Sequence, residues 1–197
     1  TRTVSLPAER IKETSKLEIL LNPSLASSIR EAIPYMIEYP YGCVEQTMSR
    51  FMPAAVAARA FQVLGYPLDR DLQEKLPKVT EQGLKRLADM QLPSGSWGWW
   101  ANDAENLYMT AYVMHGLTLA RDAEVSGDSA MFDRGLRRLG ALRDKTTSDV
   151  VEQQQRSSFS SYWWPHSIHN LMFAEYMLTL NGQSSNRTLQ VIWGRRD

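Results

Sequence analysis

The amino-acid sequence predicts an all-α protein assembled from helical hairpins. From Asn22 onward, apolar residues recur at three- and four-residue steps, which is the spacing of one helix face. Short loops rich in Gly, Ser and Trp separate these segments, among them "PSGSWGWW" at 93–100 and "SSYWWPH", which ends at His166. Hairpins joined in this way must stack to bury their apolar faces, and a stack that curls and closes would form an α/α toroid.

The residues before Asn22 depart from the helical pattern. "TRTVSLPAE" and "KLEILL" alternate apolar and polar residues, so we expect a short β segment within 1–21. Pro53 should kink the helix that follows Cys43, and Gly65 should end it. Helices are expected at about 22–38, 44–64, 69–90, 104–121, 128–143, 166–180 and 185–194.

Composition narrows the possible functions. The 197 residues, 43% of them apolar, are enough for one domain with a substantial core. Lys plus Arg number 22 and so do Asp plus Glu, which argues against broad electrostatic attraction to nucleic acid or an anionic membrane. Apolar runs fall short of the ~20 residues of a membrane span. The chain starts at Thr1 without Met, so we expect it to be a piece of a longer protein.

The single cysteine lies in "YPYGCVEQTMSRFMP" at 39–53, with Gln46 three residues after Cys43. Residues at i and i+3 share one helix face, and Gly42 gives the backbone freedom just before the helix. A helix N-terminus favours a thiolate, which is the reactive form of cysteine. Attack of the thiolate on the Gln46 carboxamide would expel ammonia and leave an internal thioester. A lone cysteine is also commonly a small buried apolar residue, so the surrounding residues must decide.

Those residues resemble the thioester domain of the alpha-2-macroglobulin and complement family. The family signature Gly-Cys-x-Glu-Gln, followed by a hydrophobic helix with a proline, stands here as "GCVEQTMSRFMP" at 42–53. "LADMQLPSGSWGWW" followed by "YMTAYVMHGL" is similar to the next repeat of the family. The resemblance is good over about 17–120, thinner towards the end, and strongest with bacterial members. Val44 departs from the Gly that vertebrate members carry between Cys and Glu.

The resemblance implies an α/α toroid of the terpenoid-cyclase type over 22–197, continued by further helices after this chain. The segment 1–21 would belong to, or lead to, a neighbouring β domain. It also implies a periplasmic or extracellular endopeptidase inhibitor rather than an enzyme. A target protease would be captured once, through a lysine amine or a hydroxyl that attacks the Gln46 carbonyl. The expected partners are proteases and the neighbouring domains of the parent chain, without nucleic acid, and with membrane attachment only through that parent.

Several neighbours of Cys43 are candidate supporting residues. Glu45 could orient the backbone or interact with the helix N-terminus, or be an ordinary solvated acid. Tyr39, Tyr41 and Met48, with the tryptophans at 97–100, could shield a thioester from water, although ordinary helix packing would also account for them.

The three histidines are further candidates. Complement members place a nucleophilic histidine at a helix start about as far along the chain as His169, and His166 is a weaker candidate. His115 is expected to be a packed core residue. With one cysteine and no ligand spacing among the histidines, we predict no metal and no other cofactor. "NRT" at 186–188 matches a glycosylation sequon but falls within an expected helix.

Two rival kinds of function are weighed against this one: a conventional enzyme on the same helical toroid, and a plain binding or structural module. The tryptophan turns resemble the repeats of triterpene cyclases loosely, but the acidic "DxDD" cluster is absent, and so is the zinc ligand set of protein prenyltransferases. A cysteine hydrolase would need a histidine paired with Cys43. A non-catalytic helical binding module would leave Cys43 inert.

Overall fold

The computed structural model describes residues 25–38, 42–65, 67–125, 127–155 and 163–194, with positions 3, 5, 7–11, 13 and 16 near the N-terminus. These residues form seven α-helices and no strand, which confirms the predicted all-α class. The helices are α1 (Leu25–Ile37), α2 (Val44–Val63), α3 (Arg70–Asp89), α4 (Leu107–Asp122), α5 (Ser129–Gln155), α6 (Trp163–Leu180) and α7 (Asn186–Trp193). The β segment expected within 1–21 lies largely outside the described residues and stays a prediction, as does the boundary at residue 22.

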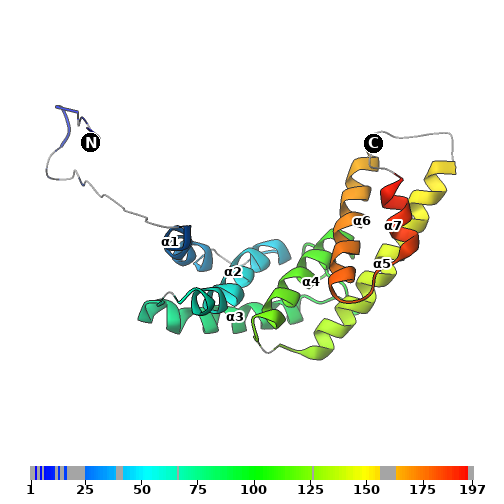
Figure 1. Ribbon diagram of the computed structural model, residues 1–197, viewed down its shortest axis with the longest axis horizontal. Coiled ribbons are helices and arrows are strands. Elements are labelled where there is room, and N and C mark those ends of the chain that lie inside the picture. The colour runs from blue at the N-terminus through cyan, green and yellow to red at the C-terminus, as the bar shows by residue number, and fades with distance from the viewer. Residues whose placement is uncertain are drawn as a thin grey trace.

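The helices form an open, curved row (Figure 1). α2 packs against α1, α3 and α4, and α4 continues the row to α6. α5 lies against both α4 and α6, and α7 completes the far end by packing on α5 and α6. The chain therefore alternates between an inner row of α2, α4 and α6 and an outer row of α3, α5 and α7.

The two rows differ in sequence as their environments require. α4 is buried on most of its circumference, including the neighbouring positions Met109, Thr110 and Ala111. The buried positions of α3 instead follow a single stripe, as Leu72, Leu76 and Val79 show, and charged residues cover the rest of the helix. A helix enclosed by neighbours must be apolar nearly all round, whereas one at the outside needs only one apolar face.

Side-chain caps fix the ends of several helices. Asp69 accepts a hydrogen bond from the Leu72 N–H at 2.9 Å, and Asn106 accepts one from the Met109 N–H at 3.0 Å. The expected helix at 69–90 is thereby confirmed within one residue at each end. α2 continues through Pro53 and ends before Gly65, whose φ of 65° is the left-handed conformation that glycine adopts readily.

The end predicted for the helix at 128–143 is wrong, because α5 runs on to Gln155. Its additional turns are held by tertiary contacts rather than by helix propensity. The Thr147 hydroxyl meets the Thr188 hydroxyl of α7 at 2.9 Å, and Val150 is fully buried. α6 also begins earlier than expected, at Trp163, with Pro165 in its first turn, where a missing N–H costs no intrahelical bond.

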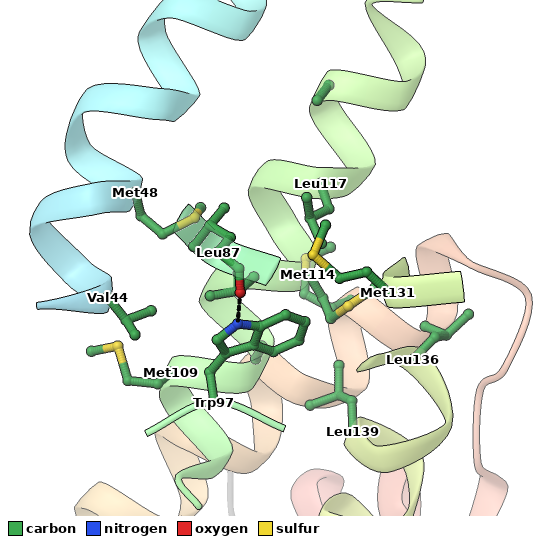
Figure 2. Packing of buried hydrophobic residues seen from close by; sticks show 14 of the residues in the cluster. Val44, Met48, Leu87, Trp97, Met109, Met114, Leu117, Met131, Leu136 and Leu139 are labelled. Atoms are coloured by element: carbon green, nitrogen blue, oxygen red, sulfur yellow. Dashed lines mark hydrogen bonds between the residues drawn. The ribbon is translucent and has the colours of Figure 1, made fainter. Parts of the chain in front are cut away.

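The main core surrounds Trp97, whose side chain is completely buried and whose Nε1–H donates to the Leu87 carbonyl at 2.8 Å (Figure 2). Close approach of the helices depends on glycines: Gly116 faces the Met48 methyl group, and Gly135 faces Met114 and Trp97. The core is rich in sulfur, and its buried methionines are Met48, Met90, Met109, Met114, Met131 and Met177.

A second, smaller cluster joins α1, α2 and α3. Its buried members are Ile33, Ile37, Ala54, Ala57, Phe61, Leu72, Leu76 and Val79. This cluster holds the later turns of α2, whereas the Trp97 core holds its first turns. The start of α2, where Cys43 lies, is therefore anchored by the larger of the two cores.

Candidate functional site

Cys43 is the N-cap residue of α2. Its backbone is extended, with φ −76° and ψ 177°, and its side chain is buried, with 8% of the residue exposed. Gln46 occupies the third helical position, so the two residues hold the two positions of a capping box. The i, i+3 spacing in the sequence thus corresponds to one shared turn at the start of the helix.

The Gln46 side chain bends back towards the N-cap. Its Oε1 accepts a hydrogen bond from the Cys43 N–H at 3.1 Å, which satisfies one of the donors left unpaired at a helix start. A β-carbon added at Gly42 would overlap this same oxygen. Glycine is therefore needed at position 42 by the close approach of the carboxamide, in addition to any need for backbone freedom.

Main-chain contacts fix this turn from two sides. The Val44 N–H donates to the Trp99 carbonyl at 2.9 Å, which ties the start of α2 to the loop between α3 and α4. From α3, Arg86 Nη2 donates to the Gly42 carbonyl at 2.8 Å, and Arg86 Nε donates to the Thr47 hydroxyl at 3.3 Å. Neither the role of Arg86 nor that of the Trp99 carbonyl was predicted from the sequence.

Thr47 connects the arginine to the cysteine. Its hydroxyl is buried and donates to the Cys43 carbonyl at 2.9 Å while accepting from Arg86. Both peptide units that flank the Cys43 α-carbon therefore have their carbonyls hydrogen-bonded. Hydrogen bonds of this kind hold a turn in one conformation, because a carbonyl that lost its partner here would be poorly solvated.

Glu45 points along α2 instead of towards the N-cap. It accepts a hydrogen bond from the Ser49 hydroxyl at 2.9 Å. Burial raises the pKa of Tyr112, and a hydrogen bond to Ser49 opposes that shift. The side chains of Glu45, Ser49 and Tyr112 thus form a polar contact between α2 and α4, next to Gln46. Ser49 and Tyr112 lie in two of the segments that carry the family resemblance, but the sequence predicted no role for either residue.

The loop that supplies the Trp99 carbonyl is itself braced by an ion pair. Arg138 donates to Glu105 through Nη2 at 2.6 Å and through Nε at 2.9 Å, and Ser96 adds a hydroxyl at 3.2 Å. The Arg138 hydrogen bonds hold the pKa of Glu105 below its usual value. This bidentate pair fixes the loop against α5.

The expected shielding residues differ in their placement. Tyr39 and Tyr41 lie outside the described residues. Met48 lies on α2, about one turn after Val44, and is completely buried in the Trp97 core (Figure 2). Trp97 belongs to the same core, whereas Trp99 and Trp100 are 45% and 57% exposed. Helix packing explains why Trp97 and Met48 are buried, and a shielding role for any of these residues stays a prediction.

The histidines are also placed differently from one another. His115 is half-buried on α4 and packs edge-on against Phe173 of α6, with ring centroids 5.9 Å apart. Burial lowers the pKa of its imidazole. His169 lies on an exposed side of α6, and the side chain of His166 is outside the description.

Other kinds of site were sought in the same part of the chain. Among the described residues, His, Cys, Asp and Glu side chains form no group of three or more that could hold a metal ion. No described helix is both long and apolar enough to cross a membrane. A groove of about 830 Å³ lies between α2, α3 and the connection after α4, lined by residues such as Ala54, Thr80 and Val125. Neither Cys43 nor Gln46 lines it.

Comparison with known proteins gives consistent matches. The family model described as the A-macroglobulin TED domain matches residues 15–162. An alpha-2-macroglobulin of Thermotoga maritima is 34% identical over 134 residues, and one of Escherichia coli K12 is 33% identical over 143 residues. These alignments cover 68% and 70% of this chain but only 8% of each relative, so the chain corresponds to a small part of such proteins.

A solved structure shares the fold. The crystal structure of Salmonella alpha-2-macroglobulin reacted with methylamine superposes with a TM-score of 0.65 at 29% identity. The match covers 89% of this chain and 11% of that one. The helical arrangement described above therefore recurs as one region of a much longer protein.

Proposed function

Because this chain belongs to the A-macroglobulin TED-domain family, we propose that Cys43 and Gln46 form an internal thioester that captures proteases covalently. The observation that carries the proposal is the first turn of α2. The Gln46 carboxamide folds back on the N-cap cysteine and places its oxygen on the Cys43 N–H at 3.1 Å. A thiol and an acyl group are thereby paired on a single turn.

Formation of the thioester needs no outside reactant. The Cys43 sulfur attacks the Gln46 Cδ, the carboxamide oxygen takes up negative charge, and the C–N bond then breaks. The nitrogen leaves as ammonia with the proton of the thiol. The helix N-terminus and the Cys43 N–H favour the negative charge at both the sulfur and the oxygen.

Opening of the thioester follows the reverse path with a new nucleophile. An amine of the target adds to the same carbon, the C–S bond breaks, and Cys43 leaves as a thiol. The target then remains attached to Gln46 through an amide, or through an ester when a hydroxyl attacks. Because the acyl group is consumed, the domain acts once and is an inhibitor rather than a catalyst.

The wider role follows from the family. Alpha-2-macroglobulins are protease inhibitors, so the proposed partners are proteases together with the neighbouring domains of the parent protein. The proposed setting is the periplasm or the outside of the cell, as in bacterial relatives. Tyr39 and Tyr41, which lie three residues and one residue before Gly42, are proposed to keep water from the thioester until a protease acts on the parent.

Mass spectrometry of the intact protein tests the thioester directly. We expect a mass lower than the sequence mass by one ammonia, and methylamine should add to Gln46 and release one thiol. Cys43→Ala and Gln46→Glu should each abolish methylamine uptake and leave the far-ultraviolet circular dichroism nearly unchanged. An inert helical module would show neither the missing ammonia nor the uptake. A hydrolase would be alkylated at Cys43 without modification of Gln46.

His169 is proposed as a second nucleophile, which would pass the acyl group to hydroxyls. Its exposure on α6 leaves the imidazole accessible. His169→Ala should then lower the uptake of glycerol relative to methylamine, since only transfer to a hydroxyl needs the imidazole. Equal loss, or no loss, of both reactions would contradict this role and leave the thioester itself in place.

A further inference from the structure

We propose that Arg86 of α3 is a positioning residue for the thioester chemistry, acting through the Gly42–Cys43 peptide. The guanidinium would strengthen the hydrogen bond from the Cys43 N–H to the acyl oxygen of Gln46. This inference rests on the proposed function, because it concerns how that thioester forms and opens. It assigns a role to a residue that lies outside the Gly-Cys-x-Glu-Gln motif.

The contacts form one continuous chain of hydrogen bonds. Arg86 Nη2 donates to the Gly42 carbonyl at 2.8 Å. That carbonyl belongs to the same peptide unit as the Cys43 N–H, which donates to Gln46 Oε1 at 3.1 Å. A positive charge at one end of this series of hydrogen bonds is thus linked to the reacting oxygen at the other end by a single amide group.

An amide group transmits polarisation because its nitrogen and oxygen share electrons. A cation bound at the carbonyl draws electron density from the nitrogen and makes the N–H a stronger donor. The reacting oxygen of Gln46 is neutral in the carboxamide and in the thioester, and it is negative only in the tetrahedral intermediate. A stronger donor therefore stabilises the intermediate more than either ground state, which is the condition for faster reaction.

A second contact of Arg86 helps to hold the guanidinium in place. Its Nε donates to the Thr47 hydroxyl at 3.3 Å, and Thr47 donates in turn to the Cys43 carbonyl at 2.9 Å. The guanidinium therefore contacts the peptide unit before Cys43 directly and reaches the one after it through the Thr47 hydroxyl. A lysine could supply the charge but not the two donors in fixed geometry.

The test compares Arg86→Lys, Arg86→Gln and Arg86→Met with the wild type in the intact protein. The rate constant of methylamine incorporation at Gln46 is measured by mass spectrometry on the molecules that still carry the thioester. Removing an oxyanion donor outright typically costs roughly 10²- to 10³-fold. Here the donor remains but is weakened, so we expect Arg86→Met to slow the reaction by about 10- to 100-fold, with Arg86→Lys intermediate.

A spectroscopic measurement separates polarisation from a general structural role. The infrared stretch of the thioester carbonyl lies lower when its hydrogen bond is stronger, so Arg86→Met should raise that frequency and Arg86→Lys should raise it less. Arg134→Met is the matched control, because Arg134 lies on another outer helix, α5, and binds Gln91 at 2.6 Å. That variant should react at the wild-type rate with an unshifted carbonyl band.

The outcomes are distinct for the two proposals. A wild-type protein without the missing ammonia and without methylamine uptake would overturn the proposed function. A reactive wild type would uphold it, and the inference about Arg86 would then fail on its own if Arg86→Gln and Arg86→Met reacted at the wild-type rate with the same carbonyl frequency. If Arg86→Met does not fold, Arg86→Gln and Arg86→Lys decide the question by the same two measurements.

Discussion

Two arginines of the outer row reach polar groups of the inner row, and they do so with different partners. Arg86 of α3 binds a main-chain carbonyl and a hydroxyl at the start of α2. Arg143 of α5 binds Glu175 of α6 at 2.6 Å and the Gln183 carbonyl at 3.2 Å. The geometry is alike, since in both cases one guanidinium joins two neighbouring segments.

The partners decide what each arginine does for the molecule. Glu175 is only 1% exposed and also accepts a hydrogen bond from the Ser185 N–H at 2.6 Å, so a charge is buried at this site and needs its counterion. The acceptors that Arg86 binds around Cys43 are neutral oxygens. We therefore expect the Arg143 site mainly to stabilise the fold, and the Arg86 site, which lies beside Cys43 and Gln46, mainly to affect the proposed thioester chemistry.

The largest expected effect on stability is that of Arg143→Met. Loss of the guanidinium leaves the Glu175 carboxylate buried without a counterion, which should lower the free energy of unfolding by about 3–5 kcal/mol. Urea unfolding of the intact protein measures this. The exposed Arg134→Met should cost less than about 1 kcal/mol. Equal costs for the two variants would contradict the contrast between a buried pair and a surface arginine.

Gly42→Ala should have a smaller effect on stability and a large effect on the thioester. The added methyl group overlaps Gln46 Oε1, so the carboxamide must leave the Cys43 N–H. We expect a loss of about 1 kcal/mol for the broken hydrogen bond. Most of the thioester should also be lost, measured as a Cys43 thiol that is already free before methylamine is added. Gly140→Ala is the control, because a β-carbon there lies 3.9 Å from the nearest atom. That variant should keep the thioester and be slightly stabilised.

Two buried threonines test the difference between the Arg86 site and the Arg143 site. Thr47 donates to the carbonyl four residues back and accepts from Arg86, while Thr147 donates in the same way and pairs with Thr188. Either change to valine should cost about 1–2 kcal/mol in urea unfolding, since a buried polar group loses its partner. Only Thr47→Val should also slow methylamine uptake. Slower uptake in Thr147→Val would show that reactivity follows stability in general.

The smallest expected effect is a pH dependence from His115. Burial lowers the pKa of its imidazole below the ordinary value of 6.5, so below that pH the unfolded chain binds more protons than the folded one. Stability should therefore fall as the pH is lowered from 6.5 through the folded pKa, and stay unaffected by this group above 6.5. His115→Gln should show a flatter pH profile in thermal unfolding. Identical profiles for the two proteins would exclude this contribution.

Among the outer helices, α3 was the most predictable. α3 combines a strong cap at Asp69 with a regular apolar stripe, and its bounds followed from these local signals. The extra turns of α5 were missed because "TTSDVV" contains residues with weak helix propensity. Contacts with α7 override that preference, as the pairing of Thr147 with Thr188 shows. Tertiary contacts of this kind leave no local trace in the sequence.

The candidate site likewise has one part that the sequence predicts and another that it does not. The spacing of Cys43 and Gln46 predicts that they share a first turn, which is where the structure places them. Arg86 could not be predicted, because it lies 44 residues from Gly42 and looks like any charged residue of an amphipathic helix. The contact from Trp99 could not be predicted for another reason. It uses a main-chain carbonyl, which every residue type possesses. Nor does the loop sequence indicate that Trp97 alone enters the core.

The methionine-rich core has a consequence for oxidative damage. Met36 and Met172 are 39% and 46% exposed, whereas the six core methionines are at most 5% exposed. A mild oxidant such as hydrogen peroxide will convert the two surface thioethers to sulfoxides first and will reach the others only when the helices separate. Once oxidised, a core methionine becomes too polar to repack beside Trp97. Sulfoxide formation at Met48 or Met109 would therefore mark a molecule that has opened around the turn that holds Cys43 and Gln46.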